Sequence, residues 1–227
     1  MSDSNARQLG VYRMNHTPVL QRVTTLFFST VVVFSLLAKV GRMAESPASP
    51  SETQPPANRR TVLVTSPADS GPGTLRQTLS EAEGGDIITF DPVVFPPTAP
   101  VTISLLSELP QIVSDGLTID ASDSGVILDG SQFTDPGTGN DCLTVNGADS
   151  VTIQGLQILN FAGEGIELTG GASNTLVGGD RSIGAASMGQ GNIISGNGGT
   201  GIWLEGVGTT GNQVRGNYIG TDMTGRV

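Results

Sequence analysis

The chain has few of the side chains on which enzymes and metalloproteins commonly depend. Its 227 residues include one cysteine, one histidine and one tryptophan, and aromatic residues make up only 4%. A single Cys142 excludes an intrachain disulfide and a cysteine metal cluster. We interpret Cys142 as a small apolar residue of the interior, with a reactive thiol as the alternative. The lone His16 lies near the amino end, so the rest of the chain has no imidazole for acid–base chemistry.

Positive charge is also scarce. From Thr61 onward the chain contains eighteen Asp and Glu, four Arg and no Lys, which gives a formal charge of about −14. Surfaces that bind nucleic acids or anionic lipids need clustered Lys and Arg, so this composition argues against both partners. It is compatible with a solvated extracellular surface, or with Ca2+ held by carboxylates and carbonyls. The sequence itself assigns no cofactor.

Glycine is abundant, at 32 residues, and it lies at the ends of the segments of a sequence repeat. The segment GIELTG at 165–170 returns as GIWLEG at 201–206, and NTLVG at 174–178 returns loosely as NQVRG at 212–216. Each segment alternates apolar and polar residues over three to five positions, which predicts short β-strands. Such strands cannot close a core by themselves, so they must stack on their neighbours.

The spacing of the repeat gives the period of the stack. Leu143 and Ile166 are 23 residues apart, and Ile166 and Ile202 are 36 apart. The second interval contains an irregular stretch, 179–191, and its removal leaves 23 again. We therefore predict that Leu143, Ile166 and Ile202 lie in register on parallel strands, with a projecting loop at 179–191.

Alternation also predicts which side chains point inward. We expect Ile166, Leu168, Ile202 and Leu204 to be buried, while Glu167 and Trp203 face outward. Gly and Asn suit the corners because both tolerate left-handed backbone angles. Near these corners lie Asn160, Asn197 and Asn217. They either stack into a hydrogen-bonded ladder or serve as ordinary turn residues.

The segment from Thr61 to residue 100 is predicted to cap the array, and residues 101–227 to form its coils. Apolar residues at Leu75, Leu79 and Ala82 have helical spacing. Thr74 is the predicted N-cap with Gln77 as its capping-box partner, and the Gly pair at 84–85 is expected to end the helix. A short helix there would cover the unpaired edge of the first coil. Among the strands predicted after it is one over Leu109–Ile112.

Residues 1–44 form a different kind of segment. The 16 residues from Val23 to Ala38 carry no charge, and arginines precede them. This length falls between a signal-peptide core and a full membrane span, so a cleaved export signal and an uncleaved signal-anchor both stay open. We expect a hydrophobic leader helix whose residues 23–38 are the only membrane contact. Residues 45–60, rich in Pro and Ser, predict an extended linker.

Several motifs of the body resemble a known family. They are GPGTLRQ at 71–77, DIITF at 86–90, LP at 109–110, LTID at 117–120, GNIISGN at 191–197 and GNYIGTD at 216–222. Together they resemble bacterial right-handed parallel β-helix surface proteins of the pectin-lyase-like fold group. The resemblance implies an all-β, right-handed parallel β-helix over about residues 61–227 of an exported, repeat-rich protein. It says little about function, because this fold serves adhesins, carbohydrate lyases and hydrolases.

The best candidate site is the outward row formed by Thr144, Glu167 and Trp203. A tryptophan beside a carboxylate is typical of sugar stacking, although an exposed strand can show the same pair. With their neighbours Glu205 and Arg215, Glu167 and Trp203 make up the candidate ligand-binding set. The resemblance implies that hydrolases of this fold use paired Asp on adjacent coils together with a His. We find no such set, and we assign no catalytic or metal-binding residue.

These observations predict an exported cell-envelope protein, secreted or at the cell surface, with an adhesive, scaffolding or carbohydrate-binding role. Its expected partner is a cell-surface or extracellular glycan. The alternatives are a fragment of a polysaccharide lyase or glycoside hydrolase, and a passive stalk. The sequence ends in mid-repeat after Thr221–Arg226. We therefore expect the last coil to be covered by a continuation of the chain or by a partner.

Overall fold

A computed structural model describes residues 59–133, 139–222 and 224–226. The predicted leader at 1–44 and nearly all of the predicted linker at 45–60 lie outside these residues. Within the described part of the chain, no helix has the length and apolar character needed to cross a membrane.

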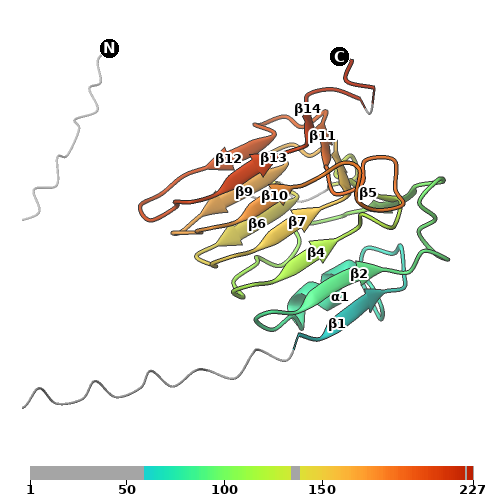
Figure 1. Cartoon of the computed structure of the whole chain (residues 1–227), viewed down its shortest axis with the longest axis horizontal. Coiled ribbons are helices and arrows are strands. Elements are labelled where there is room, and N and C mark those ends of the chain that lie inside the picture. The colour runs from blue at the N-terminus through green and yellow to red at the C-terminus, as the bar shows by residue number, and fades with distance from the viewer. Residues whose placement is uncertain (1–58, 134–138, 223, 227) are drawn as a thin grey trace, which may run out of the picture. The chain divides into compact units, whose positions relative to one another are not determined.

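The described chain folds into three parallel sheets (Figure 1). Sheet A contains β1 (Thr61–Val64), β2 (Ile87–Phe90), β4 (Thr118–Asp120), β7 (Thr152–Gln154), β10 (Leu176–Gly178) and β13 (Gln213–Arg215). Sheet B contains β3 (Val101–Ser104), β5 (Val126–Asp129), β8 (Leu156–Leu159), β11 (Ile193–Ser195) and β14 (Tyr218–Ile219). Sheet C contains β6 (Leu143–Asn146), β9 (Ile166–Thr169) and β12 (Ile202–Leu204).

From β4 onward the chain visits the sheets in the fixed order A, B, C, so that three strands make one coil. Each strand pairs in parallel with its equivalent in the neighbouring coil. Ile166 is the register partner of both Leu143 and Ile202, which confirms the predicted alignment. The chain is therefore a parallel β-solenoid built on the repeat read from the sequence.

Apolar side chains from all three sheets fill the interior. Leu168 from sheet C, Ile153 from sheet A and Ile158 from sheet B are all fully buried. Burying one such side chain contributes about 1.5–3 kcal/mol to stability. Strands of three or four residues, too short to be stable alone, are held by this shared core and by the strands on either side.

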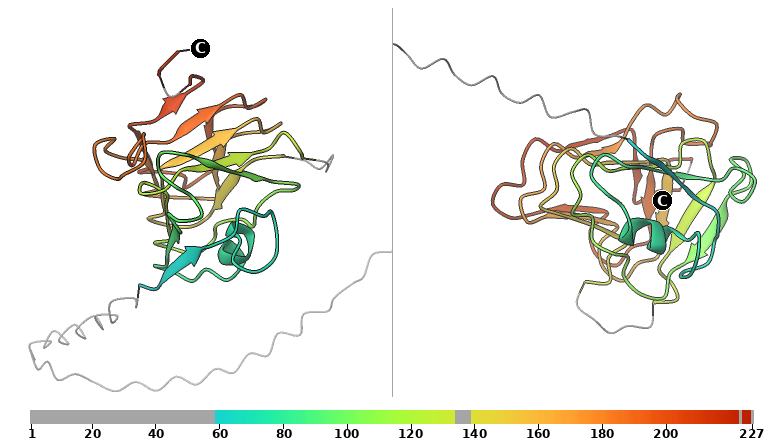
Figure 2. Two further views of the ribbon diagram at one scale, coloured as in Figure 1. Left: turned by 90° about the vertical axis from the view of Figure 1, so that its right-hand side faces the viewer. Right: turned by 90° about the horizontal axis from the view of Figure 1, so that it is seen from below.

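One helix, α1 (Leu75–Ser80), lies beside the first coil. It lies at the β1 end of the stack, and in the view from below it overlies the outline of the coils (Figure 2, right). Thr74 is its N-cap and accepts a hydrogen bond from the Gln77 N–H, as predicted. The helix ends at Ser80, before the predicted glycine pair, with Glu81 as its C-cap, where the backbone has left helical geometry at φ −105° and ψ 0°.

An arginine ties α1 to the neighbouring coil. The Arg76 guanidinium pairs with Asp69 at 2.5 Å and donates to the Ser107 carbonyl at 2.8 Å. Leu75 and Leu79 meanwhile join the hydrophobic core. The helix therefore contributes both apolar and polar contacts to the first coils.

The irregular stretch 179–191 leaves the sheets between β10 and β11, as predicted, and then folds back along the stack. The Ala186 N–H donates to the Ser122 carbonyl at 2.8 Å, and the Ala185 N–H donates to the Asp123 carboxylate at 2.9 Å. Met188 is buried at its base. The loop therefore braces an earlier coil without changing the register of sheet C.

Buried asparagines link successive coils. Asn192 is fully buried, and its carboxamide accepts from the Leu156 N–H and donates to the Ile153 carbonyl of the preceding coil. Asn217 stacks on it, because the Asn192 carboxamide also donates to Asn217 Oδ1 at 3.0 Å. This pair is a short ladder of the predicted kind.

The other two candidate ladder asparagines bond elsewhere. Asn160 donates to Asp129 and lies in the left-handed region with φ 62°. Asn197 accepts from the Phe161 N–H of the preceding coil. Both therefore join coils through groups other than a stacked asparagine.

Two sequence predictions were wrong, and one strand had no prediction. Leu204 is 46% exposed, because β12 is the edge strand of sheet C among the described residues. The segment Leu109–Ile112 forms only an isolated bridge between Ile112 and Val145, since Pro110 has no N–H to donate to a ladder. The strand Leu156–Leu159 was not predicted, although it starts one residue after the Gly155 corner.

Candidate functional site

The candidate site is the outer face of sheet C. Thr144, Glu167 and Trp203 are register partners on β6, β9 and β12, so they form one row across three coils. The apolar residues on either side of Glu167 are buried, which turns the row outward. The structure thus aligns three residues that are separated by up to 59 positions in the sequence.

Trp203 is the outermost member of this row. It is 42% exposed, and Glu205 follows it on the same face. Thr169, the residue next to Glu205 in the preceding coil, lies within 3.5 Å of its carboxylate. An indole face with a carboxylate two positions away can pack on an apolar ring and accept hydrogen bonds from its substituents.

A pair of carboxylates lies at the edge of this row. Asp141 and Glu164 each precede the first residue of their strand by two positions, and the Glu164 N–H donates to Asp141 Oδ1 at 2.6 Å. Asp141 is only 8% exposed. Burial, together with the Glu164 carboxyl and the charge of Glu167, raises the pKa of Asp141 to about 6. Asp141 therefore takes up a proton at a higher pH than an exposed aspartate does.

Glu167 is also surrounded by other carboxylates. Partial burial, followed by repulsion from Glu205 and Glu164, raises the pKa of Glu167 above its ordinary value. A hydrogen bond with Thr144 opposes this effect. Glu108 also faces this region, where its Oε1 accepts from the Asn140 N–H at 2.7 Å. The outer face of sheet C is thus strongly negatively charged.

Sequence reasoning missed Asp141 and Glu108 as members of this site. For Asp141 a signal existed, because it lies 23 residues before Glu164, which is one period of the repeat. Glu108 carried no such signal, since it lies in an irregular segment before the first strand of sheet C. Only the fold brings it toward Asn140.

The structure does not place Arg215 with the other candidate residues. It lies on β13 in sheet A, where it is exposed. There its charge, after the hydrogen bonds from Ser182, helps to lower the pKa of Asp180. The candidate site on sheet C therefore consists of Glu167, Trp203 and Glu205, joined by Asp141, Glu164 and Glu108.

Metal binding and thiol chemistry are the two other kinds of site that the structure bears on. In the part of the chain that the structure describes, no group of three or more His, Cys, Asp or Glu side chains is arranged to hold a metal ion. Cys142 is 2% exposed, and burial raises the pKa of its thiol. This placement matches the interior role predicted for Cys142, because a buried thiol with a raised pKa is inert.

A scan against protein families and a search of the curated proteins found no match to this chain.

Proposed function

We propose that this chain is an exported right-handed parallel β-helix protein of the pectin-lyase-like fold group, and that it binds an extracellular glycan on the outer face of sheet C. The observation that carries the proposal is the register of Glu167 with Trp203, which places a carboxylate beside an exposed indole. Sugars present apolar C–H faces and hydroxyl edges, and this pair offers a partner to each. The right hand follows from the strong preference of parallel crossovers.

The charge of the site favours a neutral glycan. Asp141, Glu164, Glu167 and Glu205 crowd one surface of a body that already carries about −14. A polyanionic chain would be repelled unless Ca2+ bridged it to these carboxylates. Neutral sugars with free hydroxyls meet no such barrier.

The proposed location is outside the cytoplasm. The uncharged stretch 23–38, preceded by arginines, would export the chain and either anchor it or be removed. The linker at 45–60 would then hold the β-helix away from the membrane. In this proposal α1 serves as the cap of the first coil, supported by its contacts with the core.

We also propose that a further strand layer covers the last coil, supplied by the same chain or by a partner. The inward side chains of this coil, Leu204, Val214 and Ile219, are each more than 40% exposed. Their register partners one coil earlier, Leu168, Val177 and Ile194, are buried.

Glycan binding can be tested by substitution of the indole. The full chain is applied to an array of neutral and acidic glycans, and Trp203→Ala is compared with Val207→Ala, whose side chain is fully exposed. We expect the tryptophan variant to bind at least tenfold more weakly, while the control binds as the wild type does. Wild-type protein that binds no glycan, or Trp203→Ala that binds normally, would refute the proposal.

A second candidate function is cleavage of a polysaccharide, favoured by the Asp141–Glu164 pair. Glycoside hydrolysis needs one protonated and one ionised carboxyl, and a pKa of about 6 at Asp141 is suited to the acid role. The test is release of reducing ends from the bound glycan. Turnover that disappears in both Asp141→Asn and Glu164→Gln would replace the binding role with catalysis.

A further inference from the structure

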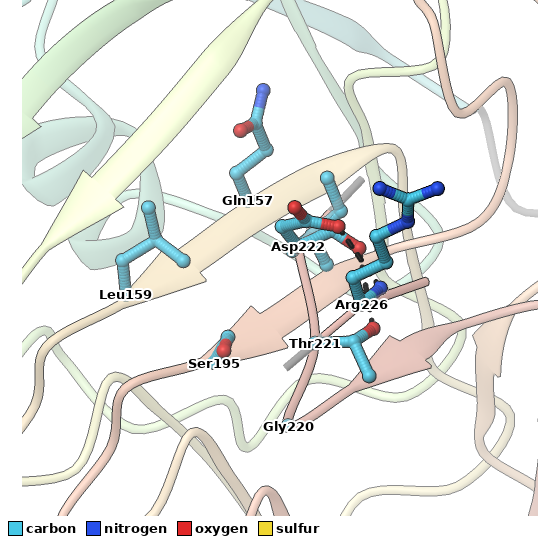
Figure 3. A pocket seen from close by; sticks show the side chains of 8 residues that line it. Gln157, Leu159, Ser195, Gly220, Thr221, Asp222 and Arg226 are labelled. Carbon is cyan, nitrogen blue, oxygen red and sulfur yellow. Dashed lines mark hydrogen bonds between the residues drawn. The ribbon is translucent and has the colours of Figure 1, made fainter. Parts of the chain in front are cut away.

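We propose that the outer face of sheet B carries a second binding site, a pocket for one neutral sugar ring. The pocket has a volume of about 500 Å3, within the range of small-molecule sites. It lies between strands β8 and β11 on one side and the residues Gly220, Thr221, Asp222 and Arg226 on the other (Figure 3). The proposal is independent of the function proposed above, because that site lies on sheet C.

The floor of the pocket combines apolar and polar side chains. Gln157 on β8 is the register partner of Ile193 on β11, and Leu159 is the partner of Ser195. The two apolar side chains therefore lie diagonally across the floor, with an amide and a hydroxyl on the other diagonal. A flat ring with a C–H face and hydroxyl edges can use both kinds of contact.

The wall of the pocket is formed by Asp222 and Arg226, which are joined by hydrogen bonds that involve the Arg226 backbone. Asp222 Oδ1 accepts hydrogen bonds from the N–H groups of Thr224 at 2.8 Å and Arg226 at 3.1 Å. The Asp222 N–H in turn donates to the Arg226 carbonyl at 2.8 Å. These bonds position the carboxylate through Oδ1 and leave Oδ2 able to accept from a ligand. The side chains of Asp222 and Arg226 both line the pocket.

This set of polar groups selects for hydroxyls. A carboxylate, a guanidinium and a carboxamide are planar groups that can each engage two neighbouring hydroxyls of one ring. Asp222, Arg226 and Gln157 supply one of each, and Figure 3 shows the Asp222 carboxylate between the other two side chains. The opposite charges of the aspartate and arginine offset each other, so the pocket suits a neutral ligand. An anionic sugar would meet the Asp222 charge and the negative field of the whole body.

The experiment uses saturation-transfer NMR on the full chain with D-glucose, D-galactose and D-mannose, and with D-glucuronate as the charged comparison. We expect transfer to the ring protons of at least one neutral hexose and none to glucuronate. Gln157→Leu should weaken this binding at least tenfold. The matched control is Thr102→Leu, an exposed residue two coils away in the same column of sheet B and outside the pocket.

The same measurement on Trp203→Ala separates this pocket from the site on sheet C. We expect hexose binding to persist in that variant. Loss of binding in Trp203→Ala with normal binding in Gln157→Leu would overturn the proposal, as would a preference for glucuronate or the absence of transfer to any hexose. If Gln157→Leu fails to fold, Arg226→Gln replaces it with the same expected loss, because Arg226 is exposed.

Discussion

Glu167 and Trp203 are register partners on neighbouring strands, although 36 positions separate them in the sequence. They meet because the stretch 179–191 leaves the sheets and returns without shifting the strands. Equivalent positions of the repeat therefore form columns, with one side chain per coil at a spacing of about 4.8 Å. A chain-like ligand lying along such a column would meet a new side chain at each coil.

The contrast between the inner residues of two coils gives a first prediction. Leu168 is fully buried, while its register partner Leu204 is 46% exposed. Leu168→Asp should unfold the β-solenoid, because it places an unpaired charge in an apolar core at a cost of several kcal/mol. Leu204→Asp should lower the melting temperature by only a few degrees. Thermal melts of both variants test this, and an equal effect at the two positions would contradict the assigned interior.

The register of the strands could be predicted because equivalent residues recur at a constant spacing in the sequence. Leu143, Ile166 and Ile202 occupy equivalent positions once the loop is removed, and parallel stacking is the arrangement that pairs them. The N-cap at Thr74 could also be predicted, because it depends only on a side-chain oxygen and an N–H three residues further along the chain. Burial at Leu204 could not be predicted from the period alone. It depends on whether another strand covers the residue.

The site was predictable only in part. Outward alternation identified Glu167 and Trp203, but Arg215 was assigned to the same site from its position in the repeat region. The fold places it on another sheet. Asp141 could not be assigned to the site from the strand pattern, because its raised pKa depends on burial and its position depends on its hydrogen bond with the Glu164 backbone. Neither property is visible in a single strand pattern.

Glycine corners provide a second prediction. Gly155 has φ +78°, and a Cβ placed there would lie 2.3 Å from the Ser122 backbone nitrogen. Gly155→Ala should therefore destabilise the fold by several kcal/mol, through backbone strain and a clash that cannot relax cheaply. Gly220 has a similar φ, +72°, but open space around the position of a Cβ. Gly220→Ala should cost only about 1–2 kcal/mol. Urea unfolding measures both, and equal losses would show that strain alone sets the cost.

The coil-bridging asparagines provide a third prediction. Asn192→Ala removes the partners of the Leu156 N–H and the Ile153 carbonyl in a fully buried site. We expect a loss of about 2–4 kcal/mol, because two polar groups are left unsatisfied. Asn212 makes the equivalent bonds to the Thr175 N–H and the Ala172 carbonyl but is partly exposed. Asn212→Ala should cost about 1 kcal/mol, since water can replace the carboxamide as the partner of both backbone groups. Equilibrium unfolding measures the loss of stability in each variant. A larger loss in Asn212→Ala than in Asn192→Ala would contradict this prediction.

The Asp141–Glu164 pair predicts how stability depends on pH. Burial and the neighbouring Glu164 raise the pKa of Asp141 from 3.8 to about 6 in the folded state. The folded protein therefore favours the protonated acid, and this contribution is complete below about pH 4 and lost as the pH rises through 6. The corresponding change in the free energy of unfolding is about 2–3 kcal/mol.

Asp141→Asn isolates this contribution, because the amide cannot ionise and its oxygen can still accept from the Glu164 N–H. At pH 7 the variant should be more stable than the wild type by about 2–3 kcal/mol, and the difference should vanish near pH 4. Asp86, whose burial is outweighed by hydrogen bonds from Arg60 and the Glu83 N–H, has a lowered pKa and acts in the opposite direction. It is present in both proteins, so it cancels in the difference. Urea unfolding at pH 4, 5, 6 and 7 supplies the comparison. A difference that stays constant, or grows as the pH falls, would show that Asp141 is ionised in the folded protein across this range.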